Sequence, residues 1–234
     1  MISQQLTRAG TCYGVLLNFR SEVEAWRTRM NKAPYKGAPK APILYVKTAN
    51  TVSPHGASIG VPAHVPQVQC GATIGMLIGP LAPTVPAARR IAGYVLMNDF
   101  SVPHESYFRP PVKYKCLDGF LGVGAYLVRP PLAGDPSRFE LEVRVNGELR
   151  QTVRFDELVR PAGELVNAVS EFMTLRPGDI LMMGCDHGSP LLKVGDSVDI
   201  SAPALRGMGI LSNTLVAEVI PPVRRSAPAR GAAV

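Results

Sequence analysis

The sequence lacks any apolar run of the roughly 20 residues that a membrane-spanning helix requires. Its first ten residues are polar and contain no apolar core of the kind found in signal peptides. These absences argue against an integral membrane protein and against export. We therefore expect a cytoplasmic protein without a membrane partner.

Cysteine is scarce and widely spaced. The four cysteines are Cys12, Cys70, Cys116 and Cys185, and no two of them form a short pair such as C-x-x-C. This spacing favours neither a zinc knuckle nor a disulfide framework. We interpret them as reduced thiols of a cytosolic protein.

Several catalytic signatures are also missing. There is no G-x-S-x-G nucleophile motif, no phosphate-binding P-loop and no dinucleotide fingerprint. Cys116 has no marked histidine partner in the sequence. The sequence therefore indicates neither nucleophilic hydrolysis nor nucleotide chemistry.

The net charge of +7 does not by itself indicate a nucleic-acid partner. Three arginines lie in residues 221–234, a segment without acids and rich in proline, alanine and glycine, so the remainder carries +4. We expect this basic tail to be disordered. No Lys/Arg cluster with interleaved aromatics occurs elsewhere, so we expect no nucleic-acid binding, and the modest excess suits a small anionic substrate.

What the sequence does contain is a pattern of short, mostly β segments. With 234 residues, 46% of them hydrophobic, residues 1–220 can form one domain with a substantial core. Strands are expected at 11–18, 43–47, 68–79, 94–97, 123–128, 139–145, 148–155 and 180–183, with further strands up to residue 219. Helices are expected at 22–30, 86–91 and 162–173. The prediction is a β-rich α+β fold without regular βαβ alternation.

Local signals refine three of these elements. Ser21 is the expected N-cap of the first helix. Asn146-Gly147 predicts a two-residue hairpin turn. Phe172 falls at helical spacing from the preceding apolar residues and is expected on the buried face of the last helix.

The polar residues of the chain concentrate between Gly93 and Gly119. An apolar run there leads into a segment with eleven polar or charged side chains: Asn98, Asp99, Ser101, His104, Glu105, Ser106, Tyr107, Arg109, Lys113, Lys115 and Asp118. A second polar loop, 184–188, also follows a predicted buried strand. Loops at the ends of buried strands often carry function. An ordinary solvated surface loop is the alternative interpretation.

The charges in this segment suit a carboxylate-bearing substrate. Arg109, Lys113 and Lys115 lie close in sequence to acidic residues, and arginine can bind a carboxylate through two hydrogen bonds. A lysine or carboxylate there could act as general acid or base if burial shifted its pKa. A salt-bridge network that only stabilises the loop would give the same pattern.

The order of motifs resembles the fumarylacetoacetate hydrolase family across about residues 11–220. The motifs are Gly93-Tyr94 with Asn98-Asp99, 115–119 (Lys-Cys-Leu-Asp-Gly), 170–175 (Ser-Glu-Phe-Met-Thr-Leu), Pro177-Gly178-Asp179, Met183-Gly184 and Val194-Gly195-Asp196. The resemblance implies a mixed β-sandwich roll with a few short helices. It also places Asp99, Lys115 and Asp118 at family active-site positions.

Within the family, the sequence is most similar to the N-terminal half, or separate N-terminal subunit, of the bifunctional isomerase/decarboxylases of 4-hydroxyphenylacetate (homoprotocatechuate) degradation. The motifs that point there include 17–21 (Leu-Asn-Phe-Arg-Ser), Ala25-Trp26, 34–36 (Pro-Tyr-Lys), 50–52 (Asn-Thr-Val) and 71–73 (Gly-Ala-Thr). This similarity implies decarboxylation of 5-oxopent-3-ene-1,2,5-tricarboxylate or isomerisation of 2-hydroxyhepta-2,4-diene-1,7-dioate.

The sequence departs from the family at the metal site. The family holds Mg²⁺ or Mn²⁺ with a Glu-x-Glu motif and an aspartate, but Gly71 and Thr73 stand where the two glutamates belong. The His-x-x-Glu catalytic pair is also absent, because Glu22 and Ala25 occupy its positions. Asp99 alone would hold Mg²⁺ weakly, so we expect no metal or other cofactor in this chain's own site.

Two hypotheses follow from these observations. In the first, the chain is an enzyme in which Lys115 and Arg109 stabilise an enolate while Glu105 or Asp118 moves a proton, with Asp99, Lys113 and Gly184 contributing to substrate binding. In the second, it is a catalytically silent partner of a metal-competent paralogue. Both predict a homodimer or a hetero-oligomer with a paralogous subunit.

Overall fold

The computed structural model describes residues 10–35, 37–80 and 85–219. The predicted tail, 221–234, lies outside these ranges. Within them, no helix is both long enough and apolar enough to cross a membrane.

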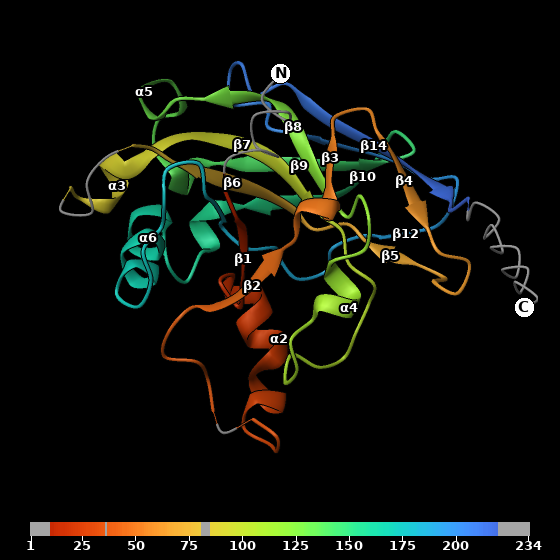
Figure 1. The fold of residues 1–234 in the computed structure, drawn as a ribbon, viewed down its shortest axis with the longest axis horizontal. Coiled ribbons are helices and arrows are strands. Elements are labelled where there is room, and N and C mark those ends of the chain that lie inside the picture. Colours follow the sequence, from red (N-terminus) through yellow and green to blue (C-terminus); the bar gives the residue numbers. More distant parts are fainter. Residues whose placement is uncertain (1–9, 36, 81–84, 220–234) are drawn as a thin grey trace, which may run out of the picture.

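Two β-sheets form the body of the fold (Figure 1). The larger sheet has seven strands in the order β2 (Ile43–Lys47), β1 (Cys12–Leu16), β11 (Ile180–Met182), β6 (Ala72–Ile78), β7 (Ile91–Asp99), β8 (Leu121–Val128) and β3 (Val52–Pro54). It is mixed, because β1 pairs with β11 and β3 pairs with β8 in parallel while its other pairs are antiparallel.

The smaller sheet has five strands in the order β10 (Glu148–Arg154), β9 (Glu140–Val145), β13 (Ser197–Ser201), β14 (Ile210–Ala217) and β4 (Ser58–Val61). Its contacts with β6, β7 and β8 place the two sheets face to face. A two-stranded sheet joins β5 (Val68–Gln69) to β12 (Leu191–Leu192). The predicted β-rich, mixed sandwich is confirmed.

The core lies between the two main sheets, where alternate residues of each strand are buried. In β9, Leu141, Val143 and Val145 are buried whereas Glu140 and Arg144 are exposed, as the alternating sequence predicts. The Asn146-Gly147 turn also matches the prediction. Both residues have positive φ, 52° and 83°, which suits the tight hairpin between β9 and β10.

Three local predictions were wrong. Residues 68–79 form two strands rather than one, because the chain leaves the small β5/β12 sheet before it enters the large sheet at Ala72. Phe19, not Ser21, is the N-cap of helix α2 (Arg20–Met30). Helix α6 (Ala162–Ser170) ends before Phe172, whose exposed fraction is 57%.

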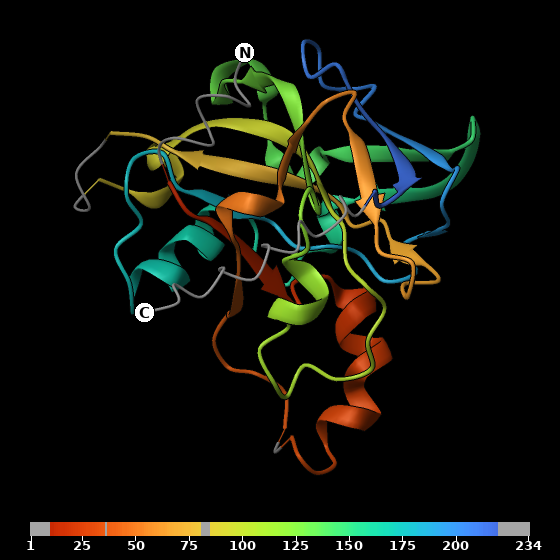
Figure 2. The same ribbon diagram turned by 45° about the vertical axis from the view of Figure 1, so that its right-hand side comes forward.

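The short helices surround the large sheet. Helices α3 (Ala87–Arg90) and α6 contact one another, and α5 (Pro130–Ala133) follows β8. Helix α2 and the loop that carries α4 (Val112–Lys115) project together on one side of the molecule in both ribbon views (Figures 1 and 2). This arrangement brings two segments that are far apart in sequence to the same end of β1 and β7.

Candidate active site

A cavity of about 220 Å³ lies where β1 and β7 end, beside α2 and α4. Its lining comes from six separate stretches of the chain: Val15, Leu16, Glu22, Trp26, Arg29, Tyr45, Gln69, Gly71, Asp99, Ser101, His104, Tyr107, Lys115, Cys185, Asp186, His187 and Ser189. Carboxyl, ammonium, guanidinium, imidazole and hydroxyl groups thus converge on one small space. This is the pattern expected of a binding or catalytic site.

The floor of the cavity is built around Asp99, the last residue of β7. Its carboxylate oxygen Oδ2 accepts a 2.6 Å hydrogen bond from Lys115 Nζ and a second bond from the Tyr45 hydroxyl. Its other oxygen, Oδ1, lies 2.9 Å from Lys47 Nζ. The side chains of Asp99 and Lys47 are wholly buried, and that of Lys115 is 8% exposed.

Strand geometry explains why these groups meet. Neighbouring residues of β7 point to opposite faces of the sheet, so Asn98 faces Gly122 and the second sheet while Asp99 faces the other way. Lys47 ends β2 at the edge of the same sheet, and its ammonium also donates to the backbone carbonyls of Phe100 and Lys115. One buried ammonium therefore ties the end of β7 to α4.

Two glycines leave the space that the side chains of this cluster occupy. Gly14 pairs with Tyr45 across β1 and β2, and a Cβ at Gly14 would lie 2.0 Å from the tyrosine ring. A Cβ at Gly71 would lie 2.6 Å from the Asp99 carbonyl oxygen and 2.8 Å from Cys185 Sγ. Side chains at either position would displace the groups that surround the Asp99 carboxylate.

The three ionisable groups of the cluster shift one another's pKa values. Burial alone would raise the pKa of Asp99, but the ammonium groups of Lys115 and Lys47 hold that pKa well below its usual range. Burial would lower the pKa of Lys115, but Asp99 raises it above its ordinary value. Burial, with the neighbouring Lys115, lowers the pKa of Lys47. The floor of the cavity therefore sets two basic side chains against one acidic one.

Glu22 of α2 contributes a carboxyl group to the cavity wall. Its Oε2 accepts a 2.8 Å hydrogen bond from the backbone N–H of Leu17, and its Oε1 lies 3.5 Å from the Tyr107 hydroxyl. Burial raises its pKa to about 7, despite the opposing effects of the Leu17 hydrogen bond and of Lys115. A carboxyl group of this kind exchanges protons near neutral pH.

Aromatic rings form the side of the cavity next to α2. Trp26 packs against Tyr107 with ring centroids 4.5 Å apart, and Arg29 lies 5.3 Å over the Trp26 ring. His104 stacks on Tyr114 at 4.7 Å, and burial lowers the pKa of its imidazole. These contacts hold the segment between β7 and α4 against α2.

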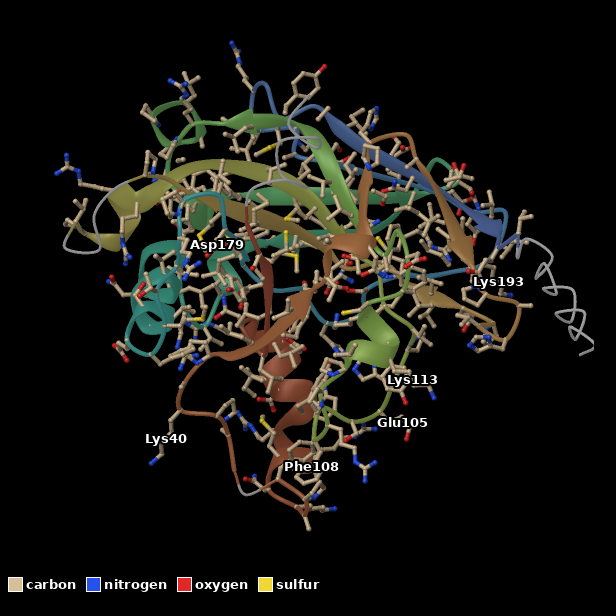
Figure 3. All side chains as sticks on the ribbon, viewed as in Figure 1. Lys40, Glu105, Phe108, Lys113, Asp179 and Lys193 are labelled. Carbon is tan, nitrogen blue, oxygen red and sulfur yellow. The ribbon has the colours of Figure 1, made fainter. Side chains whose placement is uncertain are left out.

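The structure separates the predicted site residues into two groups. Asp99 and Lys115 meet at the floor of the cavity. Glu105 and Arg109 lie outside it and line a second, more open pocket of about 510 Å³ with His104, Phe108 and Tyr114. Figure 3 shows Glu105 and Lys113 on the outer side of the α4 loop.

The remaining predicted residues also lie outside the cavity lining. Lys113 Nζ is 5.8 Å over the Tyr114 ring. Asp118 accepts a 2.6 Å hydrogen bond from Asn50 Nδ2. The Gly184 carbonyl accepts a hydrogen bond from the Thr73 hydroxyl, and its φ of +105° suits glycine at the turn after β11.

The sequence-based interpretation did not select Lys47, Tyr45 or Glu22. Lys47 gave one signal, a charged residue at the end of an otherwise apolar strand. Glu22 stands out in the sequence only as a departure from a family motif, and nothing local shows that Leu17 and Tyr107 enclose it. Among the described residues, no three His, Cys, Asp or Glu side chains are grouped so as to hold a metal ion.

Comparison with known proteins agrees with this fold. The profile of the fumarylacetoacetate (FAA) hydrolase C-terminal family matches residues 11–216. The 4-hydroxyphenylacetate degradation bifunctional isomerase/decarboxylase of Salmonella dublin is 37% identical over 212 residues, which cover 89% of this chain and 48% of that protein. The Escherichia coli protein of the same name is 35% identical, with 94% and 50% covered.

A solved structure shares the same architecture. The 5-carboxymethyl-2-hydroxymuconate delta-isomerase of Mycobacterium smegmatis superposes with a TM-score of 0.73 at 28% identity, over 91% of this chain and 80% of that one. The chain spans about half the length of the two curated relatives. The family profile matches nearly all of the described fold, and this match shows that the chain belongs to the fumarylacetoacetate hydrolase family.

Proposed function

We propose that the chain is an enzyme that forms and protonates the enolate of a small oxo-dicarboxylic or oxo-tricarboxylic acid. The reactions in view are isomerisation of 2-hydroxyhepta-2,4-diene-1,7-dioate and decarboxylation of 5-oxopent-3-ene-1,2,5-tricarboxylate. The observation that carries the proposal is the buried Asp99–Lys47–Lys115 cluster, two basic side chains around one acidic one, at the floor of a cavity. The isomerase/decarboxylase relatives supply the substrate class.

Lys115 is the group that would meet the substrate oxygen. Its ammonium uses one N–H on Asp99 and its side chain is slightly exposed, so N–H donors remain for a ligand in the cavity. Decarboxylation moves the electron pair of the breaking C–C bond onto the substrate's carbonyl oxygen. Isomerisation of the 2-hydroxy diene places negative charge on the corresponding oxygen when its hydroxyl group loses a proton. An ammonium already fixed in a buried site stabilises that oxyanion without reorganising solvent.

The residues at the family's metal position do not fit a divalent cation. Both oxygens of Asp99 face ammonium groups, at 2.6 Å and 2.9 Å, and Gly71 and Thr73 supply no carboxylate. A divalent cation would have to displace two buried lysines and would meet one charged ligand. We therefore propose that the lysine pair takes over the electrostatic role that the family assigns to its metal.

The cavity suits an anionic substrate beyond its floor. Arg29 and His187 line it as well, and Ser101, Gln69 and Ser189 offer neutral hydrogen-bonding groups. These residues support recognition of a second carboxylate. Because the curated relatives are about twice as long as this chain, we further propose that it associates with a paralogous subunit.

The test replaces Lys115 with methionine, which keeps the length of the side chain and removes its charge. We expect kcat for isomerisation or decarboxylation to fall by about 10²-fold or more, as for loss of an oxyanion donor. The matched control is Lys40→Met, because Lys40 points away from the body of the fold on the loop before β2 (Figure 3). Added EDTA should leave wild-type activity unchanged.

Two outcomes would contradict the proposal. Full activity of the Lys115→Met variant would remove the ammonium from the mechanism. Alternatively, the chain could be inactive alone while a complex with a metal-containing paralogue is active and insensitive to Lys115→Met. That result would identify the chain as a silent partner subunit.

A further inference from the structure

Glu22 occupies an unusual environment for a carboxyl group. It lies in the first turn of α2 with 8% of its surface exposed, and it lines the cavity that contains Lys115. In the described part of the chain it forms no ion pair. Burying a carboxyl group without a counter-charge is unfavourable, and such groups are frequent at functional sites.

The two oxygens of Glu22 differ in how they are held. Oε2 accepts the short bond from Leu17 N–H, and Leu17 has a φ of +58°, which is rare for a residue other than glycine. Among the residues that the structure describes, Oε1 has only the long contact of 3.5 Å to the Tyr107 hydroxyl. One oxygen therefore fixes the carboxyl group in place while the other can exchange a proton with a ligand.

The charged and titratable groups around Glu22 lie on α4, on the segment before α4 and on the loop after β11. Lys115 of α4 favours its ionised form, Asp186 of the loop after β11 opposes it, and the Tyr107 hydroxyl favours it. Arg29, His104, Cys185 and His187 share the same cavity. Desolvation outweighs the stabilising contacts, and the resulting pKa of about 7 means that both forms of Glu22 are populated at neutral pH.

We propose that Glu22 is the catalytic residue that moves the proton in the reaction outlined above. The inference rests on the proposed function, and it assigns to Glu22 the role that sequence alone gave to Glu105 or Asp118. In the first step of the isomerisation the O–H bond of the substrate's 2-hydroxyl group breaks, an O–H bond forms at Oε1, and the electron pair stays on the dienolate oxygen that Lys115 holds. In the second step Oε1 delivers the proton to C5 at the end of the conjugated system, and the C2 carbonyl forms.

A proton-exchange assay isolates the proton transfer between carbon and Oε1, run in the reverse direction on an oxo acid. The probe is 2-oxoadipate in D₂O, and the loss of its C3 proton signal in ¹H NMR reports carbon deprotonation without requiring the complete reaction. The substitution Glu22→Gln preserves the shape of the side chain and an oxygen that can accept from Leu17. The matched control is Glu24→Gln, because Glu24 lies on the same helix, is exposed and pairs with Arg27.

We expect Glu22→Gln to slow exchange by about 10²-fold or more. Binding of 2-oxoadipate, measured by calorimetry, should change less than about threefold, and Glu24→Gln should match the wild type in both assays. The wild-type exchange rate should rise through an inflection near pH 7 that the Glu22→Gln variant lacks. A merely structural role for Glu22 would not produce that loss of the inflection.

Each contrary result has a separate meaning. Wild-type exchange rates in Glu22→Gln would overturn the role of Glu22 and leave the proposed function standing. Loss of probe binding in that variant would assign Glu22 to binding and also overturn the inference. A wild-type chain that neither binds nor exchanges the probe would overturn the proposed function together with it.

The inference can be tested even if Glu22→Gln does not fold. In wild-type protein labelled with ¹³C at the glutamate side-chain carboxyl groups, one resonance should titrate near pH 7, and 2-oxoadipate should shift it. The absence of any such resonance, or its insensitivity to the probe, would overturn the proposal.

Discussion

Lys47 Nζ lies 2.9 Å from Asp99 Oδ1, and neither side chain is exposed to solvent. A buried ion pair of this kind is weak evidence for stability, since desolvation offsets most of the attraction between the charges. Its position at the cavity floor gives it a different significance. Lys47 and Lys115 share the single carboxylate of Asp99, and Lys115 is the more accessible of the two to a ligand in the cavity.

The first prediction concerns this cluster. Asp99→Asn leaves two buried ammonium groups without a counter-charge, so we expect the free energy of unfolding to fall by about 3–5 kcal/mol. Lys47→Met keeps the pair between Asp99 and Lys115 and loses contacts to two backbone carbonyls, at a cost of roughly 1–3 kcal/mol. Urea denaturation of both variants measures the difference.

The double variant Asp99→Asn/Lys47→Met completes the thermodynamic cycle. It should be more stable than Asp99→Asn alone, because one of the two unpaired ammonium groups is gone. Equal losses for the two single variants, with additive effects in the double variant, would show that the charges do not act as a unit.

The second prediction concerns the close approach at Gly71. Its missing Cβ is what allows the Asp99 carbonyl and Cys185 to come so near, so Gly71→Ala should destabilise the fold by about 1–3 kcal/mol. The matched control is Gly60→Ala, because a Cβ there would meet its nearest atom, of Glu218, at 3.7 Å. Both glycines lie outside the positive-φ region.

Thermal denaturation and activity distinguish the outcomes for Gly71. We expect Gly71→Ala to lower both Tm and turnover, because the carboxylate of Asp99 shifts with its backbone. Gly60→Ala should leave both unchanged. If the two variants behave alike, the contact between residues 71 and 99 has no role in positioning the site.

Much of the fold could be predicted from the sequence because its signals are local. The strand at 43–47 and the 146–147 turn are both present as predicted, since alternation of apolar residues and positive-φ turn residues act over a few positions. The break between Gln69 and Ala72 could not be predicted. It arises because β5 pairs with β12, which is more than a hundred residues further along the chain.

The site shows the same division. The position of Asp99 and Lys115 followed from motifs within one stretch of the chain. Lys47 and Glu22 come from distant segments, and their burial depends on how β2 and α2 pack against the end of β7. The dense polar segment also spans two environments, because Lys115 turns into the cavity while Glu105 lies on the outer loop (Figure 3). Sequence spacing does not encode that turn.

The last prediction follows from the pKa of Glu22, which burial raises from 4.5 to about 7. Between these two values the folded state binds more protons than the unfolded state, so the free energy of unfolding falls as the pH rises through this window. The contribution is fully present below pH 4.5 and is lost above about pH 7, and its size is roughly 3 kcal/mol.

The variant Glu22→Gln tests this prediction, because it has no titrating group at this position. Its stability relative to wild type should therefore increase by roughly this amount between pH 4.5 and about pH 8, as measured by urea denaturation. Glu24→Gln should follow the wild type at both pH values, and parallel curves for all three proteins would show that Glu22 titrates with an ordinary pKa.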